Sequence, residues 1–239
     1  MPRDCVFSRL WSGIVPALFL LAPAVAAAGN DAVPDTLVQR IAACAACHGK
    51  QGQGGGNGYY PRIAGKPALY LYRQLRNFQA GRRDNPMMRH MVAGLSDSYL
   101  REIADHYAGM QPPHRQRAGK SWPKAVLARG QQLVRHGDPQ RKVPACQACH
   151  GARLTGVQPA TPALIGLPAD YISAQLGAWH SHTRAAPPPD CMATVAARLD
   201  EQDIHAIAAW LASQSLPADP APMPADMVDP PLECGSLQP

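Results

Sequence analysis

The sequence is poor in aromatic residues and in charge. Aromatic side chains make up 6% of the 239 residues, only 3 residues are Phe, and charged residues make up 17%. Few aromatic residues leave little material for a core, so a large bound apolar group would help to fill each domain. No run of Lys and Arg is interleaved with aromatic residues, which argues against nucleic-acid binding despite the formal charge of +6.

Long hydrophobic runs are also missing, except at the N-terminus. Arg3 and Arg9 introduce a mostly apolar stretch at residues 11–25, and three Ala residues at 26–28 offer a small-residue cleavage site. A membrane span needs about 20 apolar residues, and two prolines interrupt this shorter stretch. We therefore expect residues 1–28 to be a cleaved signal peptide, with a membrane anchor as the alternative. The mature chain would then have no transmembrane span and would be periplasmic, in a compartment that permits disulfides.

No segment alternates as a β-strand does; instead, one series of landmarks occurs twice in the same order. The hexapeptide CAACHG at residues 44–49 returns as CQACHG at residues 146–151. The later landmarks are Pro61 and Pro162, Tyr70 and Tyr171, Gln74 and Gln175, Met88 and Met192, and Leu95 and Leu199. The repeat predicts two tandem domains at residues 29–112 and 113–217, followed by a Pro-rich C-terminal tail at residues 218–239.

Each copy is expected to be mainly α, with three helices joined by long loops. Helical segments at residues 35–46 and 124–135 precede the two Cys pairs. The middle helix opens with Pro67 or Pro168, a residue favoured in the first helical turn. The last helix follows Ser96 or Asp200, both good N-caps, and has an apolar stripe. The segments that carry Met88 and Met192 are treated as loops, and residues 111–119 as a linker.

The motif Cys-x-x-Cys-His is the attachment signature of a c-type haem. Two thiols add across the two vinyl groups of one haem, so they stand about one helical turn apart, and the His that follows supplies the proximal imidazole to the iron. The motif in both copies predicts two covalently bound haem c groups. The residues are Cys44, Cys47 and axial His48 in the first copy, and Cys146, Cys149 and axial His150 in the second.

Two other kinds of site use closely spaced cysteines. A structural zinc site needs two Cys pairs, or a Cys pair and a His pair, within one small module, whereas these pairs lie in separate copies. A thioredoxin-like redox motif needs a βαβ context, which the sequence does not show. Both alternatives are therefore weaker than haem attachment.

The sixth ligand of each iron decides the chemistry, because a Met closes the iron to substrates and raises its potential. The spacing to the next shared landmark, Leu95 or Leu199, pairs Met88 with Met192. The second copy has residues other than Met or His opposite the remaining candidates, which are Met87, His90 and Met91. We therefore predict Met88 and Met192 as axial ligands; core packing of these residues and ligation by His90 are the alternatives.

Two cysteines remain once Cys5 has left with the signal peptide and four cysteines hold haem. An even remainder in an exported protein favours a disulfide, so we expect Cys191 to pair with Cys234. Two free thiols, or pairing between chains, are the alternatives. The predicted bond would draw the tail across the second domain beside Met192.

Residues around each haem are expected to support it. Pro61 and Pro162 would shape the loop beneath the proximal His, where a backbone carbonyl accepts the imidazole N–H; ordinary turn prolines are the alternative. Arg62, Arg82 and Arg83 are candidate partners for the haem propionates, but we expect them to lie in solvent.

With these residues in hand, the chain resembles the tandem diheme class I cytochromes c, most closely the cytochrome c-four (c4) family. The resemblance covers roughly residues 35–215, through both attachment motifs, the Tyr-x-x-x-Gln-Leu helices and the Met-bearing segments. It implies two cytochrome c domains, each a few helices around one haem, related by a pseudo-two-fold axis. The loop at residues 184–191 and the Cys-bearing tail depart from the family pattern.

The resemblance implies a periplasmic electron carrier without catalytic residues, working with a terminal oxidase, a dehydrogenase or another cytochrome complex. A cytochrome subunit of a periplasmic dehydrogenase complex is the alternative. A diheme peroxidase-like enzyme would need an iron that loses its sixth ligand, and a Met in both copies argues against it. Residues 29–118 carry 12 Lys and Arg against 6 Asp and Glu, a net +6, whereas residues 119–239 carry 9 against 10, a net −1. We therefore expect a partner with an acidic patch to meet the first domain first.

Overall fold

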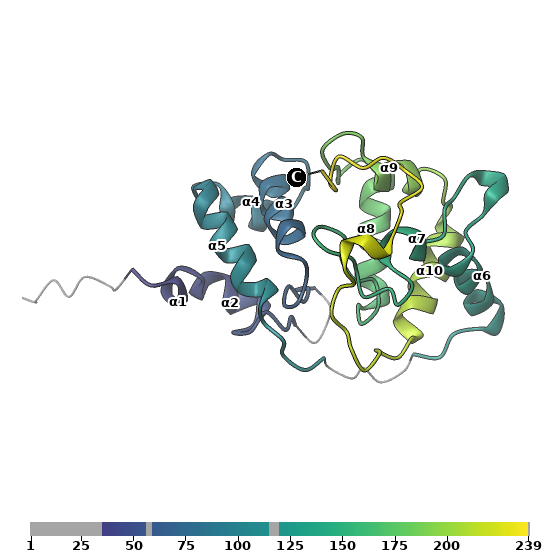
Figure 1. Ribbon diagram of the computed structural model, residues 1–239, viewed down its shortest axis with the longest axis horizontal. Helices are drawn as coiled ribbons and strands as arrows, with labels where there is room; N and C mark the ends of the chain where they lie inside the picture. Colours follow the sequence, from purple (N-terminus) through teal and green to yellow (C-terminus); the bar gives the residue numbers. More distant parts are fainter. Residues whose placement is uncertain (1–34, 56–58, 115–119, 239) are drawn as a thin grey trace, which may run out of the picture. The chain divides into compact units, whose positions relative to one another are not determined.

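The computed structural model describes residues 35–55, 59–114 and 120–238 (Figure 1). The predicted signal peptide, Cys5 and most of the predicted linker lie outside these residues. Asp35–Pro239 form one compact unit. Within its described part the chain forms helices and isolated bridges but no strand, so the mainly α prediction is confirmed. No described helix has the length and apolarity needed to cross a membrane.

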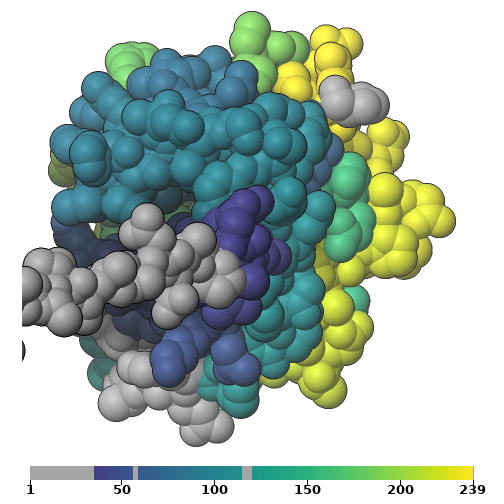
Figure 2. All heavy atoms as spheres, turned by 90° about the vertical axis from the view of Figure 1, so that its left-hand side faces the viewer, coloured from purple at the N-terminus to yellow at the C-terminus, as the bar shows by residue number. Residues whose placement is uncertain are grey.

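The described part of the first repeat contains five α-helices, and its surface, coloured purple to teal, faces the viewer in Figure 2. The predicted helix at residues 35–46 is two helices, because the chain turns at Ile41, whose side chain is buried with Ile103 and Tyr107. The helices are α1 (Leu37–Arg40), α2 (Ala42–His48), α3 (Ala68–Gln79), α4 (Pro86–Val92) and α5 (Asp97–Ala108).

The second repeat has the same order of helices, with its first helix undivided. Lys124–Arg135 is one helix, as predicted, and residues 136–145, which include a 3-10 helix, separate it from the Cys pair. The elements are α6 (Lys124–Arg135), the 3-10 helix η1 (Pro139–Arg141), α7 (Gln147–His150), α8 (Ala169–His180), α9 (Cys191–Ala196), α10 (Glu201–Ser213) and the 3-10 helix η2 (Ala225–Met227) in the tail.

Local capping explains where the longer helices begin. Ser96 and Asp200 are N-caps, as predicted, and their side chains accept hydrogen bonds from the N–H groups of Tyr99 and Asp203. Pro67 and Pro168 stand at the N-cap positions of α3 and α8, one place before the first helical turn in which the sequence had placed them.

The Met-bearing segments are short helices, α4 and α9, and not the loops that we had expected. Asn85 caps α4 by accepting from the N–H of Met88, and Asp190 caps α9 by accepting from the N–H of Ala193. These side-chain caps satisfy backbone donors that a loop would leave to water, so each segment folds into a helix. Met88 is thus three places after its cap, whereas Met192 is two places after its own.

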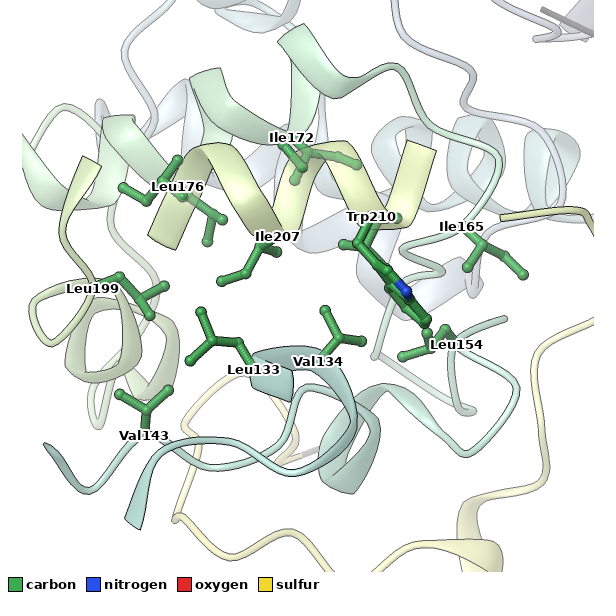
Figure 3. Close-up of a cluster of buried hydrophobic side chains, with 13 residues drawn as sticks. Leu133, Val134, Val143, Leu154, Ile165, Ile172, Leu176, Leu199, Ile207 and Trp210 are labelled. Carbon is green, nitrogen blue, oxygen red and sulfur yellow. The ribbon is translucent and has the colours of Figure 1, made fainter. Parts of the chain in front are cut away.

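The core of the second repeat lies where α6 crosses α10 and α8 packs alongside. Leu133 and Val134 of α6 point towards Ile207 of α10, and Trp210 lies in the same cluster (Figure 3). The crossing requires a glycine at residue 130, because a Cβ there would stand 2.1 Å from the carbonyl oxygen of Ala206.

Candidate haem sites and the contact between the repeats

The first attachment motif lies on α2, which places Cys44, Cys47 and His48 on one helix. His48 is buried, and its Nδ1 lies 2.9 Å from the carbonyl oxygen of Pro61. A carbonyl only accepts, so Nδ1 carries the proton and Nε2 keeps its lone pair for a metal. Burial lowers the pKa of His48 and keeps the ring neutral, as ligation of an iron requires.

The second motif repeats this geometry: Cys146 is the N-cap of α7, and Cys149 and His150 lie within that helix. Nδ1 of the buried His150 lies 2.8 Å from the carbonyl oxygen of Pro162. Burial also lowers the pKa of His150, with a smaller contribution from the charge of Lys66. The carbonyl contact that the sequence analysis expected beneath each proximal His is therefore confirmed in both repeats.

Three of the four motif cysteines lie in surroundings that disfavour the thiolate. Burial raises the pKa of Cys44 and Cys149, and raises that of Cys146 to about 12. A zinc ligand or a redox cysteine works as the thiolate, which these surroundings disfavour. Across the described residues, no group of three or more His, Cys, Asp and Glu side chains could hold a metal ion. A neutral thioether to a haem fits the sites better.

A cavity in the second repeat brings the predicted site residues together. Cys146, Cys149, His150 and Met192 all line it. Most of its other walls are apolar, which suits a large apolar group. These walls include Ile172, Leu176, Leu199, Ile207 and Leu211 from α8, α10 and the segment between α9 and α10.

The candidate sixth ligands differ in burial. Met88 packs against the buried cluster of Phe78, Val92 and Leu100, whereas the side chain of Met87 is 62% exposed and His90 is exposed. Met192 packs against the core of the second repeat. Met88 and Met192 thus contact the buried cores of their repeats, whereas Met87 and His90 are exposed. Met91 is half-buried like Met88, so only the repeat separates these two.

The two repeats meet through a symmetric set of polar residues. Arg83 donates to the side-chain oxygens of Gln74, at 3.1 Å, and Gln175, at 2.7 Å. Arg184 donates to the same two oxygens, at 2.6 Å for Gln175 and 3.1 Å for Gln74. Both pairs are equivalent positions of the repeat, so the contact is self-complementary, like the interface of a two-fold dimer.

Backbone and ring contacts extend this symmetry. Arg83 and Arg184 form an isolated antiparallel bridge. Arg83 lies over the ring of Phe78, with 4.7 Å to its centroid, and Arg184 lies over that of Trp179, at 3.8 Å. Each arginine therefore gains cation–π attraction to a neutral ring of its own repeat.

The expectation that Arg62, Arg82 and Arg83 lie in solvent is wrong for two of the three. Arg83 is half-buried between the repeats, and Arg62 donates to the carbonyl oxygens of Pro112 and Pro113. Arg82 is exposed. Arg184 was not among the predicted site residues, although the repeat places it opposite Arg83 just as it places Gln175 opposite Gln74. Aligning the two copies pairs these residues but does not show that they meet between the repeats.

The C-terminal tail covers the second cavity. A disulfide joins Cys191, the first residue of α9, to Cys234, with 5.1 Å between the Cα atoms. Leu232, Cys234, Ser236 and Leu237 line the cavity. Arg73 of α3 donates to the carbonyl oxygens of Ser236 and Gln238. The tail is thus held both to α9 beside Met192 and to the first repeat.

Comparison with known proteins agrees with this geometry. The family model described as cytochrome c matches residues 35–110 and 127–215. The chain is 40% identical over 203 residues to a protein of Thiomonas intermedia named "thiosulfate dehydrogenase electron acceptor", covering 84% of this chain and 88% of that protein.

Two solved structures are similar in fold. Reduced cytochrome c4 of Pseudomonas stutzeri matches with a TM-score of 0.63 and 29% identity, over 73% of this chain and 95% of the other. The thiosulfate dehydrogenase TsdBA of Marichromatium purpuratum matches with a TM-score of 0.65 and 34% identity, over 76% of this chain. The chain spans 39% of the length of the TsdBA chain.

Three observations lead to one assignment. They are the two Cys-x-x-Cys-His motifs whose His rings contact a backbone carbonyl, the large apolar cavity, and the match to the family model. The protein carries two covalent haem c groups and transfers electrons. The chain belongs to the cytochrome c family, as a tandem diheme protein of the cytochrome c4 type.

Proposed function

We propose that this protein is the electron acceptor of an exported dehydrogenase that oxidises thiosulfate. The observation that carries the proposal is the 40% identity, over 84% of the chain, to a protein named as such an acceptor. The match to part of TsdBA supports it, because a module of this fold occurs there within one chain of a thiosulfate dehydrogenase. Each haem takes one electron, so one molecule stores two.

We further propose that His48 and Met88 ligate the first iron, and that His150 and Met192 ligate the second. Neutral, buried imidazoles and inward-facing thioethers support this ligation. A thioether stabilises ferrous iron and fills the sixth position, so the protein would carry electrons without turning over a substrate of its own.

Export to the periplasm belongs to the same proposal. The apolar N-terminal stretch with its small-residue cleavage site supports export. The disulfide between Cys191 and Cys234 also supports an oxidising compartment.

The experiment mixes the oxidised holoprotein with a purified thiosulfate dehydrogenase and thiosulfate, and follows haem reduction by visible absorption. We expect both haems to be reduced only when dehydrogenase and thiosulfate are both present. Reduction by thiosulfate alone would show that no dehydrogenase is needed and would contradict the proposal. No reduction in the complete mixture, by a protein that dithionite does reduce, would contradict the proposed partner.

A general carrier of the cytochrome c4 type is the second candidate, favoured by the coverage of 95% of the Pseudomonas stutzeri cytochrome. Size-exclusion chromatography with the dehydrogenase separates the two. A dehydrogenase subunit should co-elute with the enzyme at low and at physiological salt, whereas a diffusing carrier should elute alone.

A further inference from the structure

One charged residue breaks the symmetry of the contact between the repeats. Lys66 lies just before α3, and the register that pairs Tyr70 with Tyr171 places Leu167 at the equivalent position of the second repeat. Leu167 packs against the apolar core. The positive charge therefore occurs in one repeat alone, and the shared fold does not require it.

Lys66 is buried in the second repeat's cavity although it belongs to the first repeat. The residue is 9% exposed and lines the cavity together with Cys146, Cys149 and His150. Burial lowers the pKa of Lys66, and the nearby arginines lower it further. An ammonium in such a place is costly unless an anion accompanies it.

The described residues offer no such anion. Lys66 takes part in none of the ion pairs formed among residues 35–55, 59–114 and 120–238. Asp190 is the one carboxylate among the described lining residues, and its oxygens accept from the N–H groups of Ala186 and Ala193. That carboxylate is therefore engaged in holding the start of α9.

Other donors converge on the same region without a carboxylate. Arg184 is 5% exposed, and burial together with the charge of Arg83 lowers its pKa to about 10. Burial raises the pKa of Tyr171, but Arg83, Arg184 and Lys66 together bring it below its ordinary value. Trp179 lines the cavity, and its buried Nε1 finds no acceptor among the described residues. This concentration of positive charge, together with the N–H of Trp179, is suited to a carboxylate ligand.

We propose that the Lys66 ammonium binds a propionate of the haem attached to Cys146 and Cys149, so that the first repeat supplies the counter-charge for the second repeat's haem. The proposal rests on haem binding at that site. A haem brings two carboxylates and an iron whose charge rises on oxidation. A nearby fixed cation disfavours the oxidised form and holds the potential of the second haem up.

The test replaces Lys66 in the holoprotein and measures both haem potentials by spectroelectrochemical titration. Lys66→Leu installs the residue that the second repeat has, Lys66→Arg keeps the charge, and Lys124→Leu removes an exposed cation at the start of α6 as the matched control. A unit charge at ~10 Å in an effective dielectric of about 20 changes an equilibrium roughly tenfold. We expect Lys66→Leu to raise the oxidised-to-reduced ratio of the second haem about tenfold, which is about 59 mV for one electron.

The first haem's potential should stay unchanged in Lys66→Leu, and both potentials should stay unchanged in Lys66→Arg and Lys124→Leu. The titration wave whose potential changes in Met192→Ala belongs to the second haem. The mass of each denatured variant is measured beforehand and gives the number of attached haems, so a failure of haem binding is recognised separately from a change in potential. If Lys66→Leu does not load two haems, Lys66→Gln replaces it. Unchanged potentials, equal shifts of both haems, or an equal shift in Lys124→Leu would overturn the proposal.

Discussion

Removing the disulfide by Cys234→Ser should loosen the tail and the sixth-ligand helix together. The bond joins residues 43 positions apart, and closing a loop of this length stabilises the folded state by about 4 kcal/mol in the chain-entropy model. Contacts that survive the substitution hold part of the tail, so the measured loss should be about 2 to 4 kcal/mol. These contacts include the bond from the Gly235 N–H to the Pro189 carbonyl, at 2.8 Å, and those from Arg73.

Urea unfolding of the oxidised holoprotein, followed by circular dichroism, measures this loss. A loss of 2 to 4 kcal/mol should lower the midpoint by about 1 to 2 M. Because Cys191 is adjacent to Met192, the weak charge-transfer band of Met-ligated ferric haem should also lose intensity at urea concentrations below the main transition.

The double variant, Cys191→Ser with Cys234→Ser, is the control for a stray thiol and should unfold like the single variant. Native protein with both cysteines open to alkylation would refute the reasoning. So would an unfolding free energy of Cys234→Ser within about 0.5 kcal/mol of the parent.

Three further substitutions test the remaining structural assignments. Met88→Ala should abolish the first haem's share of the Met–Fe(III) band and lower its potential, whereas Met87→Ala, at an exposed position, should change neither. The opposite result would show that the ligand is the Met two places after the helix cap, as Met192 is in α9, and that burial does not select it. Gly130→Ala should lower the free energy of urea unfolding by about 1 to 3 kcal/mol, because the added Cβ meets the Ala206 carbonyl. Gly177→Ala, with open space around the residue, should raise the free energy of unfolding by about 0.5 to 1 kcal/mol. Equal effects of the two substitutions would contradict the close crossing of α6 and α10 at Gly130. Asp203 lies 2.9 Å from Arg129 and 2.6 Å from Arg141, and although burial raises its pKa, these bonds lower it overall. Asp203→Asn should therefore cost about 1 to 3 kcal/mol at pH 7. Since the folded-state pKa is lowered, this difference should be complete above pH ~4 and should vanish as the pH falls further; a difference that does not depend on pH would contradict the charge argument.

The sequence by itself determined the chemistry of attachment and the places where the longer helices begin. A Cys-x-x-Cys-His motif carries its ligand geometry within one helical turn, and caps such as Ser96 and Asp200 act on N–H groups three residues away. These are local effects, so they survive whatever the rest of the chain does. The repeat gives each position an equivalent in the other copy, and among the candidate ligands Met88 alone has a Met at its equivalent position.

Tertiary structure alone decided what covers each side chain. Nothing near Arg83 in the sequence indicates that the second repeat will bury it, and nothing near Lys66 indicates that its ammonium will enter the cavity of another repeat's haem. The disulfide that holds the tail beside Met192 was predicted from the count of cysteines, whereas the contacts of Arg73 in α3 with the tail depend on the fold. Burial and charge compensation depend on groups distant in sequence that the fold brings together, whereas motifs and caps depend on neighbours along the chain.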